Sequence, residues 1–222
     1  MNPLPMNDWS TLPAPAPLPV FHSRVVPVVV IHHVAHAVPM ARALLAGGID
    51  VIEITLRSDA ALEAMAAVAR EVPEMMVGAG TLTRPGEVAA VVAAGARFAL
   101  SPGCTPALMA AVRQAQLPFI PGVATPSEAM AARDAGYTLM KCFPAAPLGG
   151  AEVLKAWGGP LPDLRFCPTG GVSLANMGAL LALPNVAMVG GSWLTPAAAV
   201  QSGDWARVTQ LAQEALAQVP TP

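Results

Sequence analysis

Lysine is scarce in this chain, and one of the two lysines lies where a charged side chain is costly. Lys155 follows the helical run GGAEVL and is expected on the surface, whereas Lys141 lies inside the apolar segment LMKCF. An amine in an apolar site, or near another cation, has a lowered pKa and can attack a ketone in its neutral form. Lys141 is therefore a candidate nucleophile. A structural ion pair is the alternative, which burial alone leaves open.

A carboxylate occupies a similar position in another apolar segment. Glu53 lies in VIEITLR and is the only acidic residue in the interior of a predicted strand. Because side chains alternate across a strand, Glu53, Thr55 and Arg57 share one face. We expect the carboxylate and the guanidinium to enter the same cavity as Lys141. There Glu53 either only neutralises a neighbouring cation or also carries protons for the amine.

Two pairs of glycines follow the last two predicted strands. The segments are Thr169-Gly170-Gly171 and Gly190-Gly191-Ser192. Glycine lets the backbone approach an anion closely, and barrels often bind phosphate through backbone N–H groups of these two loops. A single Gly-Gly pair can serve a turn alone, but two pairs at these positions favour a phosphate site.

The elements that carry these residues alternate regularly between strand and helix. Eight β-branched or apolar segments are followed by Ala-rich segments with helical periodicity. They are RVVPVVVI (24–31), VIEIT (51–55), MMVGAG (75–80), RFALS (97–101), PFIPG (118–122), LMKCFP (139–144), LRFCPTGG (164–171) and VAMVGG (186–191). Strict alternation indicates a parallel sheet, and eight units favour a (β/α)8 TIM barrel with its active site at the carboxyl ends of the strands. An open doubly wound sheet is the alternative, but it usually has a Gly-rich loop after the first strand, and VVVIHHV contains no glycine.

Helix boundaries are also readable in places. Gly47 and Gly48 predict the end of a helix over HAVPMARALLAGG. Ser58 is predicted to cap the helix in DAALEAMAAVAREV. Thr125 and Glu128 predict a capping box at the start of another helix, in TPSEAMAARDAGY.

Composition excludes several classes of protein. The chain has 222 residues, 54% of them hydrophobic and 12% charged, which suits one domain with a large core. Net charge is −2 without a basic run, so nucleic-acid binding has no electrostatic support. No long uninterrupted apolar run predicts a membrane span, and the first twenty residues do not resemble a signal peptide. We expect residues 1–20 to be a Pro/Ala-rich N-terminal extension, extended over 12–19, and residues 21–222 to form a single catalytic domain.

The remaining candidates for chemistry are weaker. His32 and His36 have the i, i+4 spacing of metal ligands, but no carboxylate or cysteine accompanies them, so no metal site and no cofactor are predicted. The three cysteines are Cys104, Cys142 and Cys167. An odd number without CxxC spacing suits reduced thiols in the cytoplasm better than disulfides.

Taken in order, the motifs resemble those of the 2-keto-3-deoxy-6-phosphogluconate (KDPG) and 2-keto-4-hydroxyglutarate (KHG) aldolases. The matching segments run from about Val25 to Leu194. They are VVPVVVI, HAVPMARALLAGGIDVIEITLRS, VGAGTL, FALSPGCTP, FIPGVATPSE, KCFPA, RFCPTGGV and GGSWL. The resemblance implies a homotrimer of (β/α)8 barrels. It also implies a metal-free Schiff-base mechanism on a small phosphorylated keto acid, which yields pyruvate and glyceraldehyde 3-phosphate from KDPG.

The resemblance also assigns roles to single residues. Lys141 is expected to be the Schiff-base lysine and Glu53 the general acid/base, and the remaining site residues surround the substrate. Expected substrate-binding residues are Arg57, Thr81, Pro102, Phe143 and Thr169; expected phosphate-binding residues are Gly170, Gly171, Gly190, Gly191 and Ser192. Thr169 in PTGG resembles the gluconate-type members, since galactonate-type relatives tend to carry an apolar residue there. Ala146 departs from the pattern, because relatives often have an acidic residue after FPA; this concerns local surface charge.

Several alternatives stay open at this point. The same lysine could serve a KHG, galactonate-type or oxaloacetate-type pyruvate lyase. A non-catalytic phosphosugar-binding barrel would need the lysine to be absent or displaced. A metal-dependent aldolase or epimerase would need a ligand cluster that the sequence does not offer.

Overall fold

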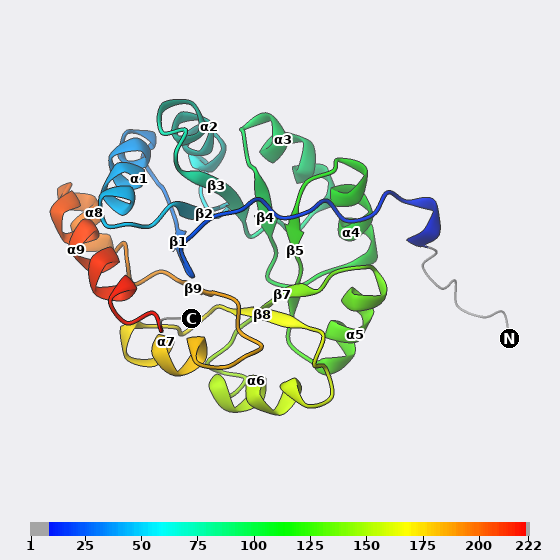
Figure 1. Cartoon of the computed structure of the whole chain (residues 1–222). Coiled ribbons are helices and arrows are strands. Elements are labelled where there is room, and N and C mark those ends of the chain that lie inside the picture. The colour runs from blue at the N-terminus through cyan, green and yellow to red at the C-terminus, as the bar shows by residue number, and fades with distance from the viewer. Residues whose placement is uncertain (1–8, 221–222) are drawn as a thin grey trace, which may run out of the picture.

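The computed structural model describes residues 9–220 and shows an α/β fold, with helices arranged around a curled set of parallel strands (Figure 1). The strands are β1 (Val25–Val29), β2 (Val51–Thr55), β3 (Met76–Gly80), β4 (Phe98–Leu100), β5 (Phe119–Ile120), β6 (Gly122–Val123), β7 (Leu139–Cys142), β8 (Arg165–Pro168) and β9 (Val189–Gly191). The α-helices are α1 (Ala37–Ala46), α2 (Ala61–Glu71), α3 (Val88–Ala93), α4 (Pro106–Gln114), α5 (Pro126–Asp134), α6 (Ala151–Gly158), α7 (Leu174–Leu181), α8 (Ala197–Ser202) and α9 (Trp205–Leu216). Short 3-10 turns are η1 (Trp9–Thr11), η2 (Val34–His36) and η3 (Pro85–Glu87).

Every strand pairing in the described chain is parallel. One sheet has the order β5-β4-β3-β2-β1-β9, and a second has the order β6-β7-β8. Isolated parallel bridges join Phe166 to Val186 and Thr169 to Gly190, between the strand β8 region and the strand β9 region. All residues of β1 and β2 are buried, as expected for strands covered on both faces. The α/β class with a parallel sheet is thus confirmed.

The predicted strand over residues 118–122 is two short strands in the structure. β5 and β6 are separated only by Pro121, and they belong to different sheets. Proline has no backbone N–H and cannot donate to a ladder, which explains the interruption at this residue.

The helix boundaries agree with the sequence in two cases and differ in one. α1 ends just before Gly47, and Thr125 forms the predicted capping box with Glu128 at the start of α5. Ser58, however, does not cap α2. The N-cap is Ala60, and the Ser58 hydroxyl instead donates to the carbonyl of Ile31. The prediction was wrong because the serine finds an acceptor at the end of β1, outside its own helix.

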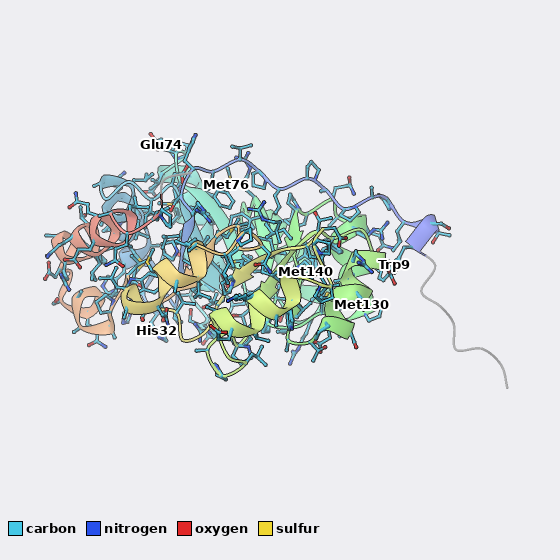
Figure 2. All side chains as sticks on the ribbon, turned by 60° about the horizontal axis from the view of Figure 1, so that its bottom comes forward. Trp9, His32, Glu74, Met76, Met130 and Met140 are labelled. Carbon is cyan, nitrogen blue, oxygen red and sulfur yellow. The ribbon has the colours of Figure 1, made fainter. Side chains whose placement is uncertain are left out.

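A segment that we call the N-terminal strap, residues 9–20, runs from β1 past β4 and β5 to α4 (Figure 1). Apart from η1 it contains no helix or strand, and residues 1–8 of the predicted extension lie outside the described range. Figure 2 shows Glu74 and Met76, at the amino end of β3, on the side along which the strap runs, while His32, beyond the carboxyl end of β1, lies on the opposite side. The strap therefore covers the amino edge of the strands.

Arg113 of α4 holds the strap in place. Its side chain is 5% exposed and donates to the carbonyls of Pro13 (2.6 Å), Trp9 (3.1 Å) and Leu12 (3.2 Å), and to that of Ala135 at the end of α5 (3.3 Å). The guanidinium also lies 5.3 Å from the centroid of the Trp9 ring. A buried charge needs such a set of acceptors, so Arg113 joins the strap, α4 and α5 in one network.

Candidate active site

Parallel strands present all their carboxyl ends at one edge, and the predicted site residues lie there. Each belongs to the last residues of a strand or to the loop that follows it. They are Glu53 on β2 and Arg57 after it, Thr81 after β3, Pro102 after β4, Lys141 on β7 and Phe143 after it, Thr169, Gly170 and Gly171 after β8, and Gly190, Gly191 and Ser192 on and after β9. This is the edge at which α/β folds carry their active sites.

The side chains of Lys141 and Glu53 form a buried ion pair between the two sheets. The Lys141 amine donates to Glu53 Oε1 at 2.9 Å, and the two residues are 4% and 0% exposed. They come from β7 and β2, which belong to different sheets, so the contact spans the interior. A pair so deeply buried is weak support for stability, because the loss of hydration offsets most of the attraction. Its geometry does suit transfer of a proton from the amine to the carboxylate.

The second oxygen of the Glu53 carboxylate is unused. Glu53 Oε2 is buried and has no hydrogen-bond partner within the described residues. Buried polar atoms are nearly always paired, so an unpaired carboxylate oxygen beside an amine marks a place for a hydroxyl group or a water. Glu53 can thus contact the lysine and a reacting group at once.

The surroundings of the lysine are apolar on two sides. The Phe143 ring centroid lies 5.7 Å from the Lys141 amine nitrogen, and Cys167 is the register partner of Lys141 on β8. Burial raises the pKa of the Cys167 thiol to about 12, which keeps it protonated and uncharged beside the lysine.

The loop after β4 reaches the other strand that neighbours the lysine. Gly122, in register with Lys141 on β6, donates its N–H to the Ser101 hydroxyl at 3.1 Å. A Cβ at Gly122 would overlap the backbone of Ser101, Pro102 and Gly103, so only glycine lets this loop approach. Pro102 in this loop stays a predicted pocket wall. The contact between Ser101 and Gly122 was not predicted, although a glycine at the end of a strand was the available signal.

Arg57 is exposed, and its side chain is held by a hydrogen bond to the last residue of β2. Its Nε donates to the Thr55 hydroxyl at 3.3 Å, and that hydroxyl donates to the Val29 carbonyl at 2.9 Å. Within residues 9–220 Arg57 forms no ion pair, and the cation that pairs with Glu53 is Lys141. Its charge is therefore available to an anionic ligand.

Thr81 has an unusual backbone conformation. Its φ is 59°, in the left-handed region that β-branched residues rarely adopt. Such strain persists where surrounding structure enforces it and is found often at functional sites. The substrate-binding role that the resemblance gives to Thr81 stays a prediction.

The glycines of the two loops are required for different reasons. Gly170 and Gly171 have φ of 94° and 76°, so glycine there serves the backbone turn. Gly190 and Gly191 have no positive φ; a Cβ would overlap the Thr169 hydroxyl at Gly190 and the Trp193 ring at Gly191. Gly190 and Gly191 are buried, so the absence of a side chain there leaves room for the Thr169 hydroxyl and the Trp193 ring.

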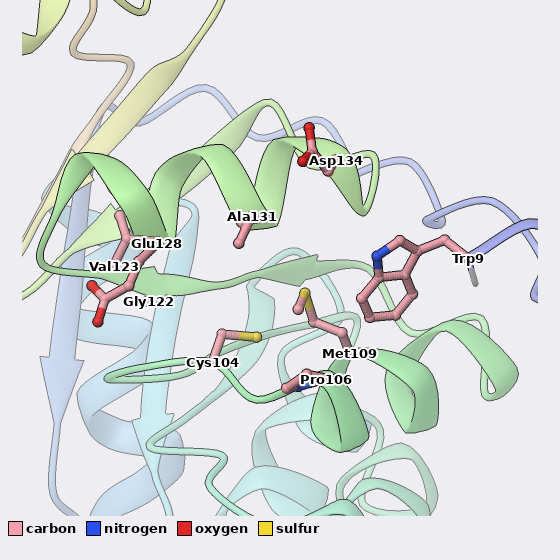
Figure 3. Close-up of a pocket in the computed structure, with 10 residues that line it drawn as sticks. Trp9, Cys104, Pro106, Met109, Gly122, Val123, Glu128, Ala131 and Asp134 are labelled. Carbon is pink, nitrogen blue, oxygen red and sulfur yellow. The ribbon is translucent and has the colours of Figure 1, made fainter. Parts of the chain in front are cut away.

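A separate cavity of about 440 Å³ lies between α4 and α5, with Trp9 at one end (Figure 3). Its lining residues are Trp9, Cys104, Pro106, Met109, Gly122, Val123, Glu128, Ala131, Ala132 and Asp134. It contains no lysine, and its Glu128 carboxylate already accepts from the N–H groups of Ala124 and Thr125. The amine chemistry therefore belongs to the interior pair and not to this cavity.

The described residues contain no group of three or more His, Cys, Asp or Glu side chains arranged to hold a metal ion. In the same part of the chain, no helix is both long enough and apolar enough to cross a lipid bilayer. The rings of His33 and His36 lie edge to face at 5.5 Å, and the His36 ring also contacts Trp205.

The curled parallel sheet and the buried lysine–carboxylate pair define an α/β protein with an amine at the edge where such folds carry their active sites. The model of the KDPG and KHG aldolase family matches residues 20–211. The chain belongs to this family.

Named relatives and solved structures extend the comparison. A protein of Dickeya dadantii named 2-dehydro-3-deoxy-phosphogluconate aldolase is 53% identical over 96% of this chain and 98% of its own length. The KHG/KDPG aldolase of Escherichia coli K12 is 51% identical over 95% of this chain and 98% of its own. The KDPG aldolase of Legionella pneumophila, solved with pyruvate captured at low pH as a covalent carbinolamine, superposes with a TM-score of 0.84 at 47% identity, covering 86% of this chain and 93% of that one. The enzyme of Zymomonas mobilis ZM4, solved with 3-phosphoglycerate, gives a TM-score of 0.82 at 40% identity, covering 87% and 90%.

Proposed function

We propose that this chain is a class I aldolase that cleaves KDPG to pyruvate and glyceraldehyde 3-phosphate. The observation that carries the proposal is the buried contact of 2.9 Å between the Lys141 amine and Glu53 Oε1. The names of the relatives, and the carbinolamine formed by pyruvate in the Legionella enzyme, support the same chemistry.

In the first half of the reaction Glu53 accepts a proton from Lys141, which leaves a neutral amine. The amine adds to the C2 ketone to form a carbinolamine, and Glu53 returns a proton so that water leaves and an iminium ion forms. Arg57 binds the substrate carboxylate and holds C2 near the amine.

In the second half the iminium ion accepts electrons from the breaking bond. Glu53 Oε2 takes the proton of the C4 hydroxyl, directly or through a water, and the C3–C4 bond breaks to release glyceraldehyde 3-phosphate. The enamine is then protonated at C3, and hydrolysis of the iminium frees pyruvate and Lys141.

The other site residues contribute binding energy away from the reacting carbons. Thr81 helps Arg57 to hold the keto-acid end of the substrate, and Pro102 and Phe143 form walls of the pocket. Thr169 contacts the substrate hydroxyl groups. The loops at Gly170 and Gly171 and at Gly190, Gly191 and Ser192 bind the phosphate through backbone N–H groups and the serine hydroxyl.

We also propose that the strands close into a complete barrel and that the chain has one catalytic domain. Residues 21–222 form one catalytic (β/α)8 barrel, preceded by an N-terminal extension over residues 1–20. Support comes from the single residue between β5 and β6 and from the bridges between the regions of β8 and β9. A homotrimer stays a prediction of the resemblance, and a cytoplasmic location stays a prediction from the number and spacing of the cysteines.

The test is reduction with borohydride in the presence of pyruvate, followed by peptide mass mapping. Lys141 should carry the reduced pyruvate adduct, and Lys141→Ala should lose both the adduct and KDPG cleavage. Lys155→Ala is the matched control, because Lys155 is exposed, and it should retain both. An adduct confined to Lys155, or cleavage by Lys141→Ala near the unsubstituted rate, would contradict the proposal.

A second candidate substrate is 4-hydroxy-2-oxoglutarate, which the same steps would split into pyruvate and glyoxylate. The matching family model covers KHG aldolases, and the Escherichia coli relative carries both names. The ratio of kcat/KM for KDPG and for this unphosphorylated acid decides between them, since only KDPG uses the phosphate loops.

A further inference from the structure

Gly80 ends β3 directly beside the Glu53 side chain. Its φ is not in the left-handed region, so its backbone conformation is open to any residue. A Cβ at this position would overlap Glu53 Oε1 and would lie 2.5 Å from Cγ and 2.8 Å from Cδ of Glu53. The volume that any other side chain at position 80 would fill is therefore occupied by the Glu53 carboxylate.

We infer that Gly80 is a positioning residue for the aldolase reaction: the missing side chain at position 80 keeps the Glu53 carboxylate against the Lys141 amine. The inference rests on the proposed function. Gly80 does not contact the substrate, and it affects the reaction only through the position of Glu53.

A methyl group at Gly80 would displace Glu53 before it disturbed the fold. The obstacle is a side chain with rotatable bonds, unlike Gly122, where the added Cβ would meet the backbone of Ser101, Pro102 and Gly103. A rotated Glu53 loses the hydrogen bond between Lys141 and Oε1 and also moves the unpaired Oε2. Both oxygens serve proton transfer, so displacement slows the proton-transfer steps and leaves the carboxylate-binding Arg57 in place.

Gly78 offers a matched control on the same strand. Gly78 and Gly80 are two residues apart and share one face of β3. A Cβ at Gly78 would meet the Phe98 ring, at 2.6 and 2.7 Å from its Cε2 and Cε1, instead of Glu53. Phe98 stacks on Phe21 near the amino edge, with ring centroids 5.7 Å apart. Gly78→Ala thus adds the same group on the same face, where it strains packing and not the carboxylate.

The experiment compares the unsubstituted chain, Gly80→Ala, Gly78→Ala, Glu53→Ala and the double variant Gly80→Ala/Glu53→Ala. The main readout is exchange of the pyruvate methyl protons with deuterated water, followed by NMR, which measures protonation of the enamine without cleavage. We expect Gly80→Ala to slow exchange by about 10- to 100-fold, with a much smaller change in the pyruvate concentration at half-saturation. Gly78→Ala should lower the Tm and keep the exchange rate when measured below its Tm.

The double variant tests whether the effect passes through Glu53. In the Glu53→Ala background the space beside position 80 is empty, so Gly80→Ala should change exchange by less than about twofold. If Gly80→Ala proves unstable, the loss of Tm should disappear in the double variant for the same reason.

Three results would overturn the inference: exchange by Gly80→Ala at the unsubstituted rate, a full additional loss in the double variant, or a Tm loss that persists there. Failure of the proposed function would look different, because the unsubstituted chain would then form no borohydride-reducible adduct at Lys141. An adduct there together with normal exchange in Gly80→Ala removes only the role of Gly80.

Discussion

Buried polar side chains at the carboxyl edge lie beside glycines from neighbouring strands. Glu53 fills the space over Gly80, and the Thr169 hydroxyl fills the space over Gly190. Thr169 is 4% exposed, and its hydroxyl makes only long contacts, 3.4 Å to the Cys167 carbonyl and 3.8 Å to the Cys167 sulfur. The hydroxyl is therefore held in position while most of its hydrogen-bonding capacity stays available to a substrate.

Replacing Thr169 by valine should reduce discrimination between the gluconate and galactonate epimers of the substrate. Valine keeps the branched shape and removes the hydroxyl, so the preferred epimer loses one hydrogen bond, roughly a five- to tenfold fall in the ratio of the two kcat/KM values. Thr169→Ser retains the hydroxyl and should retain most of the ratio. If the valine variant and the unsubstituted chain had the same ratio of kcat/KM values, another group would distinguish the two epimers.

At this scale the sequence indicated the residues of the central pair but not what positions them. Lys141 and Glu53 stood out because charged residues are rare inside apolar strands. Gly80 and Ser101 could be placed at strand ends but given no role, because their contacts depend on which residue lies opposite on the next strand. That register is set by sheet pairing, which local periodicity does not contain.

At the scale of the elements, the strap is held by several hydrogen bonds from one side chain, that of Arg113. Arg113→Ala should lower the free energy of unfolding by about 3 kcal/mol, because it removes a buried charged donor and leaves its acceptors, the buried Ala135 carbonyl among them, without that partner. KDPG cleavage by the folded variant should stay near the unsubstituted rate, since the strap covers the amino edge. Urea unfolding and steady-state kinetics measure the two effects.

Arg70→Ala is the matched control for that substitution. Arg70 pairs with Glu71 on the surface, with side chains 68% and 44% exposed, so its loss should change stability by less than about 0.5 kcal/mol. Equal effects of the two substitutions would mean that the Arg113 network contributes no more than an ordinary surface pair.

Element boundaries were predictable where the signal was local. Thr125 and Glu128 lie three residues apart and satisfy each other, so the start of α5 could be read from the sequence. The start of α2 could not be read from Ser58, because the Ser58 hydroxyl donates to the carbonyl of Ile31, 27 residues away. Alternation likewise indicated where the strands lie, but not the division of the segment 118–122 into two strands at Pro121.

For the molecule as a whole, packing keeps all three thiols unreactive. Burial raises the pKa of Cys104 and Cys167 to about 12 and that of Cys142 to about 11. Thiolate is the reactive form and is favoured only above the pKa, so at pH 8 at most about one thiol in a thousand is ionised. Alkylation at pH 8, followed by mass spectrometry, should be slow for the native chain and should accelerate as the pH rises.

In urea the same thiols should become reactive together. Unfolding removes the burial that raises each pKa, so labelling of the three cysteines should follow one transition, which coincides with loss of the circular dichroism signal. Rapid labelling of Cys104 alone in native buffer would show that the region between α4 and α5 opens locally.

The strap also has a consequence for the order in which the chain folds. Arg113 bonds to Pro13, 100 residues earlier in the chain, and to Ala135, 22 residues later. The strap, which precedes α4 and α5 in the chain, thus has no complete docking site until both helices exist, and contacts of such sequence separation form late. Interactions absent from the folding transition state slow unfolding and leave the folding rate unchanged. The strap should therefore act on the lifetime of the native state and not on the speed with which that state is reached.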